Sequence, residues 1–154
     1  MIDLEAITFR PLRMEEAGLA NNLAMTVGFK TEPDVWRWML SIGRGTAAHD
    51  PELGLVGTIV VHPYGPDVAM IAMMIVHGER QQRGIGKSLL GQALGRGSFS
   101  THALYATALG EKLYRPFGFV DQGENLRLEG TLTGSSASDP ALRVMTAADL
   151  PRVI

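Results

Sequence analysis

The segment at residues 68–76, with the sequence VAMIAMMIV, constrains the fold of this chain most strongly. Each of its residues is apolar, so both alternating faces of an extended backbone would be hydrophobic. Such a run is typical of a strand that is buried on both sides, and a buried helix segment is the less favoured alternative. The Pro and Gly residues at positions 63–66 indicate a turn before the run, which favours the strand.

Strand and helix patterns alternate around this segment. Further strands are expected at residues 7–10, 46–49, 55–62 and 103–106, with a hairpin turn at residues 50–52. Helical periodicity marks residues 13–24, 34–42, 85–94 and 110–117. Residues 119–121 and 126–128 are expected to close the fold as a second hairpin. This alternation predicts an α/β or α+β fold built on a mixed sheet.

Composition excludes several classes of protein and site. A length of 154 residues fits one compact domain, and a net charge of −2 argues against a generally basic surface for nucleic acid. The chain has no cysteine, so it has no disulfide, thiolate metal site or cysteine nucleophile. Its four histidines show no paired spacing, and no metal site is expected. No apolar run approaches the ~18 residues of a membrane span, and residues 1–12 carry acids where a signal peptide has a basic start. We therefore expect a cytoplasmic protein.

The C-terminal part of the chain predicts a linker followed by a short repeat. Residues 133–140, TGSSASDP, have the composition of a linker. Residues 142–150 then repeat the pattern of residues 9–17, with an arginine, an apolar residue two positions later, and an acid with an apolar position at a helix start. We expect a domain over residues 1–132, a linker over 133–140, and a segment over 141–154. That segment is either an ordinary C-terminal tail helix or the start of a second, homologous domain.

The stretch VHGERQQRGIGKSLL at residues 76–90 leads from the apolar segment through a polar loop into a helix. Unpaired backbone N–H groups and the positive end of the helix then point at one spot, which favours an anion. Gly84 and Gly86 would let a phosphate approach the backbone, and Arg80, Arg83 and Lys87 add positive charge. A helix start with solvated basic residues is the alternative, and the two glycines with three cations favour the anion site.

Two nucleotide-binding motifs do not fit this loop. A P-loop would need glycine at position 81, where Gln81 stands, and the Rossmann spacing fails after Gly86. The run from Gln81 to Gly86, QQRGIG, instead resembles the Q/R-x-x-G-x-G/A pyrophosphate loop of the GNAT acetyltransferases. Downstream, residues 113–119, LYRPFGF, are similar to the LY-x-x-x-GF signature of that family. The likeness extends over residues 7–128 and implies a mostly antiparallel sheet, flanked by helices and splayed at its central strands.

The resemblance implies acetyl-CoA as co-substrate and no metal. The pantetheine arm would lie along Met74, Ile75 and Val76, and a strand N–H near Met74 would polarise the acyl carbonyl. Thr107 is a further candidate for lining the site. The loop residues that would hold the pyrophosphate are Gln81, Gln82, Arg83, Gly84, Ile85, Gly86, Lys87 and Ser88.

Tyr114 is the residue that the resemblance implies for catalysis. In the family this tyrosine lies near the CoA sulfur and protonates the departing thiolate. The alternative is a core tyrosine that packs its ring and exposes its hydroxyl, and the LYRPFGF context favours the acid. The lack of cysteine agrees with direct transfer without an acyl-enzyme.

The general base and the acceptor stay open. Residues 68–76 carry no ionisable side chain, where many GNAT members place a glutamate. Asp67, His77 and Glu32 are candidates, unless a neutral amine enters and no base is needed. Phe29, Trp36 and Trp38 surround the region where relatives shape the acceptor pocket, but the two tryptophans are two positions apart on a helix, so one of them is expected in the core.

Two functions are therefore considered. The first is an acetyl-CoA-dependent N-acetyltransferase acting on a primary amine of a small molecule or a protein. The alternative is an acyl-CoA-binding sensor or structural module without significant turnover. Neither nucleic acid nor a membrane is expected as a partner, and a homodimer is left open.

Overall fold

The computed structural model describes residues 4–95, 97, 99–126, 130–131 and 140–152. The chain divides into two compact units, Met1–Gly123 and Glu124–Ile154. Within the described residues, no helix has the length and apolar character needed to cross a membrane.

The first unit is built on one sheet whose strands lie in sequence order. The strands are β1 (Thr8–Leu12), β2 (Arg44–Asp50), β3 (Gly54–Tyr64), β4 (Val68–Val76) and β5 (Thr101–Leu104). Neighbouring strands from β1 to β4 are antiparallel, and β5 runs parallel to β4. The predicted mixed, mostly antiparallel sheet is therefore confirmed.

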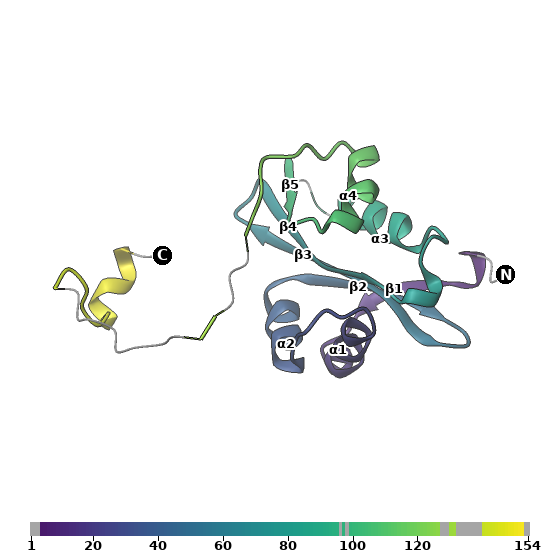
Figure 1. The fold of residues 1–154 in the computed structure, drawn as a ribbon, viewed down its shortest axis with the longest axis horizontal. Coiled ribbons are helices and arrows are strands. Elements are labelled where there is room, and N and C mark those ends of the chain that lie inside the picture. Colours follow the sequence, from purple (N-terminus) through teal and green to yellow (C-terminus); the bar gives the residue numbers. More distant parts are fainter. Residues whose placement is uncertain (1–3, 96, 98, 127–129, 132–139, 153–154) are drawn as a thin grey trace. The chain divides into compact units, whose positions relative to one another are not determined.

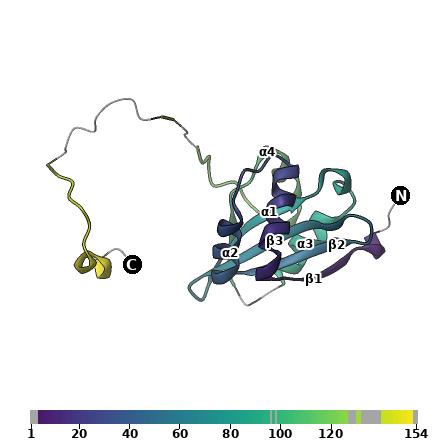
Figure 2. The ribbon, with the colours of Figure 1, turned by 90° about the horizontal axis from the view of Figure 1, so that it is seen from below.

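Helices cover both faces of this sheet. Helices α1 (Ala17–Thr26) and α2 (Pro33–Ile42) lie on one face, and α3 (Ile85–Leu94) and α4 (Ala108–Tyr114) lie on the other (Figures 1 and 2). Short 3₁₀ turns complete the fold at Leu4–Ala6, Met14–Glu16, Gly78–Arg80 and Arg115–Phe117. Each face has its own hydrophobic core, and Val56, Ile59 and Leu89 belong to one while Leu23, Trp36 and Val60 belong to the other.

Strand β4 contributes to both cores, as its sequence predicts. Ala69 and Ile71 pack with α3, while Ile75 packs in the core under α1 and α2. Alternate side chains of an extended strand point to opposite faces, so an apolar run without polar interruptions suits a strand covered on both sides. The predicted bounds of β4 and α3 agree with the structure.

An ion pair joins β1 to the start of the first helical segment. Arg10 donates to both carboxylate oxygens of Glu16, at 2.8 and 2.6 Å, and Glu16 also accepts from the backbone N–H of Arg13 at 3.0 Å. The Arg10 guanidinium, by its hydrogen bonds, lowers the pKa of Glu16 to about 2. Glu16 therefore fixes the turn between strand and helix as an anion.

Several predicted elements differ from the structure. Helix α4 spans Ala108–Tyr114 rather than residues 110–117, because Thr107 caps it, and Arg115–Phe117 form a separate 3₁₀ turn. Strand β5 begins at Thr101 rather than residue 103, because the Thr101 N–H already bonds to the Asp67 carbonyl beside the start of β4. The expected hairpin strand at residues 119–121 is wrong. Gly118 adopts a left-handed backbone, and the Asp121 side chain accepts from the Gly123 N–H, so the chain turns there instead of extending. Leu126 is not in a strand, and residues 127–128 lie outside the described residues.

The second unit contains one short helical element, Ala147–Arg152, among its described residues. Arg143, four positions before this element, forms an ion pair with Asp149 inside it. Residues 133–139 of the expected linker lie outside the described residues, so the predicted domain limits stay predictions.

Candidate active site

Strands β4 and β5 part halfway along β4. Their parallel pairing runs from Val68 opposite Thr101 to Ile71 opposite Leu104 and then stops. From Ala72 to Val76, the edge of β4 that faces away from β3 has no neighbouring strand in the described part of the chain. The backbone along this edge is therefore open to an extended ligand.

A bulge lies in β4 where the strands part. The register places Thr58 opposite Ile75 and Val60 opposite Ala72, so Ile59 faces both Met73 and Met74. Met73 has a φ of 51°, which is strained for a residue with a side chain. The Thr58 hydroxyl donates to the Met73 carbonyl at 2.9 Å and holds this bulge from the buried side.

The loop after β4 is held against the end of that strand. The Gln81 side-chain amide donates to the Val76 carbonyl at 3.1 Å. Gln82 and Gly84 both have positive φ, of 60° and 84°, and Gly84 is the N-cap of α3. Between Gln82 and Lys87, no backbone N–H donates to an acceptor within the described residues. This first turn therefore presents several unsatisfied donors at the positive end of a helix.

The start of α3 meets both β4 and α4 at Gly86. A Cβ there would lie 3.2 Å from Met74 Cε, 3.4 Å from Leu113 Cδ2 and 3.7 Å from Val76 Cγ2. The absence of a side chain at Gly86 lets the helix approach the strand end closely, since a Cβ would require the flexible end of Met74 to shift by a few tenths of an ångström. The loop, the open strand edge and α4 are thereby brought to one place.

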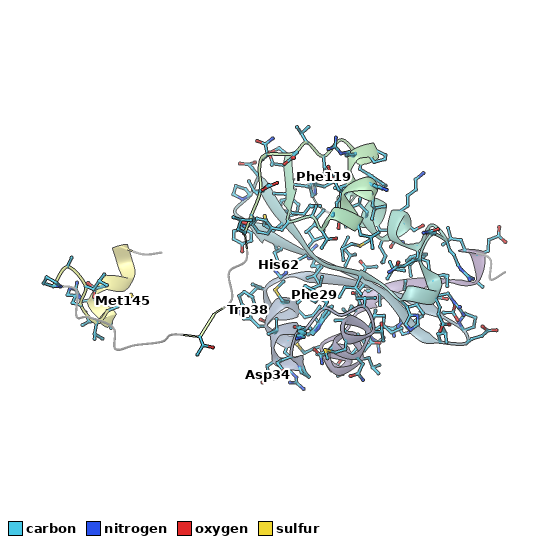
Figure 3. The ribbon with its side chains drawn as sticks, in the orientation of Figure 1. Phe29, Asp34, Trp38, His62, Phe119 and Met145 are labelled. Carbon is cyan, nitrogen blue, oxygen red and sulfur yellow. The ribbon has the colours of Figure 1, made fainter. Side chains whose placement is uncertain are left out.

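Tyr114 ends α4 beside this junction. Its side chain is 8% exposed and belongs to the core cluster that includes Ile85, with Met74 packed against it. Its ring packs edge-on against Phe119 at 5.8 Å, and Phe119 lies on the α4 side of the sheet (Figure 3). Burial raises the pKa of the Tyr114 phenol above its usual value of 10.0. The hydroxyl therefore stays protonated at neutral pH.

Comparison with known families identifies this arrangement. The sequence model of the acetyltransferase (GNAT) domain matches residues 46–121, which include β4, the loop after it and Tyr114. The chain contains a GNAT acetyltransferase domain. The family expected from QQRGIG and LYRPFGF is thus confirmed.

Solved structures share the fold of this GNAT domain. A candidate acetyltransferase from Pyrococcus horikoshii has a TM-score of 0.67 and 22% identity over 79% of this chain, which spans only 46% of that protein. A predicted acetyltransferase from Clostridium acetobutylicum, solved with acetyl-CoA, has a TM-score of 0.64 and 16% identity, covering 80% of this chain and 96% of its own. A ribosomal-protein-alanine N-acetyltransferase from Brucella melitensis biovar Abortus has a TM-score of 0.62 and 19% identity, covering 81% of this chain and all 100% of its own. No protein of curated function matches the sequence.

Most of the predicted cofactor residues of the GNAT domain lie together. Met74, Ile75 and Val76 form the open end of β4, and the residues from Gln81 to Ser88 form the loop and the first turn of α3. The exceptions in exposure are Ile75 and Ile85, whose side chains are buried in the two hydrophobic cores. These two residues would offer a ligand only their backbone groups.

Arg80 departs from the expectation that it adds charge for a phosphate. Its Nε donates to Asp50 Oδ2 at 2.5 Å, and Nη2 donates to Glu52 Oε2 at 3.2 Å. The Arg80 side chain is buried, and its charge is paired with the two carboxylates of the β2–β3 turn. The exposed cations of the loop are Arg83 and Lys87, which form no ion pair with a described residue.

Thr107 has a structural role that the sequence analysis did not anticipate. It is the N-cap of α4, and its hydroxyl accepts from the Gly110 N–H at 3.2 Å. A Cβ on Gly110 would lie 3.3 Å from this hydroxyl oxygen and 3.6 Å from the Tyr114 hydroxyl oxygen. Thr107 therefore fixes the helix that carries Tyr114, and its contact with a cofactor stays a prediction.

None of the three base candidates is drawn into the junction by a side-chain contact. His77 caps the turn after β4 by accepting from the Glu79 N–H at 3.3 Å, and Glu32 is the exposed N-cap residue of α2. Asp67 contributes its backbone carbonyl to Thr101 and Ser100. The described residues also contain no group of His, Asp and Glu side chains arranged to hold a metal.

The aromatic residues near α2 divide as expected. Trp36 is fully buried in the core, whereas Trp38 is 58% exposed. Phe29 and Trp38 lie on the side of the sheet that α1 and α2 cover (Figure 3).

Sequence reasoning overlooked two buried polar residues of β3, namely Thr58 at the bulge and His62, whose ring nitrogens have no partner among the described residues. The sequence signal for both is that Thr58 and His62 are polar residues in the otherwise apolar run at residues 55–62.

Proposed function

We propose that this GNAT domain is an N-acetyltransferase that moves the acetyl group of acetyl-CoA directly to a primary amine of a small molecule or a protein. The observation that supports this most is the convergence at Gly86 of an open strand edge, a row of free N–H groups and the helix that carries Tyr114. The Clostridium neighbour solved with acetyl-CoA and the Brucella neighbour named as an N-acetyltransferase support the same reaction class.

The loop after β4 fits a pyrophosphate. The N–H groups from Gln82 to Lys87 lack acceptors in the described chain and lie at the positive end of α3. Anions are stabilised at such helix ends by these donors and by the helix dipole. The exposed Arg83 and Lys87 add charge at the same place, while Arg80 keeps the loop in position through Asp50.

The open edge of β4 fits the amide-containing pantetheine arm. Backbone groups of Met74, Ile75 and Val76 would bond to it as a neighbouring strand would. The bulge at Met73, fixed by Thr58, sets the direction of these groups. When bound, acetyl-CoA supplies a thioester, whose carbonyl carbon is open to attack by an amine.

Tyr114 acts on the leaving group in the proposed transfer. The amine nitrogen forms a bond to the carbonyl carbon as the carbon–sulfur bond breaks, and Tyr114 donates its hydroxyl proton to the departing sulfur. The proton lost by the amine returns to the phenolate through solvent. A neutral phenol is required for this step, and burial keeps Tyr114 in that form.

The amine enters as the neutral base in this scheme. Strand β4 has no ionisable side chain, and His77 is engaged in capping a turn. The reaction is therefore expected to accelerate with pH until the acceptor amine is deprotonated.

An assay of thiol release tests the proposal. The protein is incubated with acetyl-CoA and a panel of primary amines, including peptides with free N-termini, and free CoA is measured with a thiol reagent. We expect release that depends on an amine and that Tyr114→Phe lowers about 100-fold. Absence of release with every amine would contradict the proposal.

An acyl-CoA sensor without turnover is the second candidate. The absence of a carboxylate on β4 favours it, because many GNAT domains place a glutamate there. The two candidates differ in one respect: a sensor is stabilised against heat by acetyl-CoA and releases no CoA thiol with any amine.

A further inference from the structure

The second unit repeats the hydrogen bonds that join β1 to the first helical turn. In the first unit, Arg10 donates to the carbonyl of the next residue at 3.1 Å and to both oxygens of Glu16, six positions later, at 2.8 and 2.6 Å. In the second unit, Arg143 donates to the carbonyl of the next residue at 3.2 Å and to both oxygens of Asp149, again six positions later, at 2.8 and 2.5 Å.

The likeness extends to the turn between arginine and acid. Three positions after each arginine, a backbone N–H donates to the acid, from Arg13 to Glu16 at 3.0 Å and from Thr146 to Asp149 at 2.8 Å. A 3₁₀ turn begins four positions after each arginine, at Met14 and at Ala147. Four hydrogen bonds with the same spacing and atoms of the same kind define the same turn into a 3₁₀ element twice.

The surroundings of the two elements differ sharply. In the first, β1 pairs with β2 along its whole length, and Leu12 is 6% exposed. In the second, Met145 at the position of Leu12 is 58% exposed, and Leu142 at the position of the half-buried Phe9 is 77% exposed. Among the described residues of the second unit, none forms a strand that could pair with residues 142–145.

The ion pair alone does not account for this element. Arg143 is 67% exposed, and an exposed pair of this kind adds little to stability. A tail helix would also not require apolar residues in the extended segment that precedes it. The element becomes favourable when a strand like β2 pairs with residues 142–145 and a hydrophobic layer covers their side chains.

We propose that residues 142–152 are the first strand and first helical turn of a second domain of the same fold in the same polypeptide. Their partner is an antiparallel strand that plays the part of β2, with small side chains beside Leu142 and Met145 as Ala48 and Gly45 lie beside Phe9 and Leu12. This inference rests on the repeated hydrogen bonds and not on the proposed acetyl transfer, so either can fail without the other.

The intact mass of the polypeptide isolated from its source cells is the first test. These 154 residues have a mass of 16.6 kDa. A second domain of roughly 100–150 residues would bring the mass to about twice that value. An intact mass of 16.6 kDa would overturn the proposal.

Hydrogen exchange then locates the pairing. In the native polypeptide, the amides of residues 142–145 are expected to be protected like those of β1, whereas in the 154-residue chain they exchange freely. Free exchange in the longer polypeptide would overturn the proposal. So would protection in the 154-residue chain that grows with its concentration, because strand exchange between copies would then supply the partner.

Arg10→Ala and Arg143→Ala form a matched pair of variants. In the 154-residue chain, only Arg10→Ala is expected to lower the melting temperature. In the native polypeptide, each variant is expected to lower the melting temperature of its own domain by several degrees. An Arg143→Ala variant without effect on the native polypeptide counts against the repeat.

Discussion

The Nε of Arg80 donates a 2.5 Å hydrogen bond to Oδ2 of Asp50, and this bond joins the loop after β4 to the turn between β2 and β3. Oδ1 of Asp50 accepts from the N–H groups of Glu52 and Leu53, so the carboxylate is also the centre of its own turn. The Arg80 guanidinium and these N–H groups lower the pKa of Asp50 to about 2. Arg80 is therefore a positioning residue of the loop, and Arg83 and Lys87 are the cations left for a ligand.

Replacing the two arginines of the loop separates these roles. Arg80→Ala leaves Asp50 buried without its partner, and we expect the melting temperature to fall by about 5 °C or more. Arg83→Ala removes an exposed side chain without an ion pair, and the melting temperature is expected to change by less than about 2 °C. Its KM for acetyl-CoA should rise severalfold instead. Equal loss of stability in both variants would contradict the assignment.

Thr58→Val tests the bulge in β4. Valine keeps the shape of threonine but cannot donate to the Met73 carbonyl, so the strained backbone at Met73 loses its support. We expect a rise of about 5- to 10-fold in KM for acetyl-CoA, corresponding to one net hydrogen bond. Thr46→Val is the control, because Thr46 is a buried threonine of the neighbouring strand β2 and the Met73 carbonyl accepts its side-chain bond from Thr58. If both variants leave this KM unchanged, the bulge does not set the binding edge.

Tyr114→Phe removes only the hydroxyl at the end of α4. The ring still packs against Phe119, so the fold and the acetyl-CoA affinity should be retained while kcat falls about 100-fold. Tyr105→Phe, at a side chain that is 75% exposed, is the matched control and should keep full activity. A Tyr114→Phe variant with normal kcat would remove this residue from the mechanism.

Acid should weaken the fold through two carboxylates. The pKa values of Glu16 and Asp50 in the folded chain are both about 2, below their ordinary values of 4.5 and 3.8. A depressed folded pKa contributes stability that is present above the ordinary value and is lost as pH falls toward the folded one. The free energy of unfolding should therefore be steady near neutral pH and fall between about pH 4.5 and pH 2.

The variant Glu16→Gln checks the source of this acid loss. Denaturant unfolding at several pH values should give a shallower decrease for the variant, with the part due to Asp50 remaining. An unchanged slope would mean that the Arg10–Glu16 pair is equally formed in the unfolded chain.

Patterns within single segments were enough to predict much of the sheet and the loop. The apolar run at residues 68–76 and the glycines before α3 gave the bounds of β4 and α3, because local periodicity decides a strand with two buried faces and a helix with one. The loop proposed to hold the cofactor lies in the same stretch, and its ligand stays a prediction. By contrast, Arg80 was expected to face a phosphate, because its partner Asp50 lies thirty positions earlier and meets it only through the packing of the β2–β3 turn against the loop.

Other features depend on contacts that a linear pattern does not contain. The bulge at Met73 arises from the register between β3 and β4, and Thr58 acquires its role only across that pairing. The hairpin strand expected at residues 119–121 failed because Asp121 turns the backbone toward Gly123, a local bond that outweighs the apolar character of Phe119 and Val120.

Titration of the ¹⁵N-labelled protein with acetyl-CoA, followed by amide chemical shifts, tests the central claim most directly. Binding at the proposed site should move the amides of residues 74–76 and 82–87 most, with the Tyr114 amide responding and the amides of β1 unaffected. Shifts that avoid the loop after β4, or no shifts at millimolar acetyl-CoA, would contradict it.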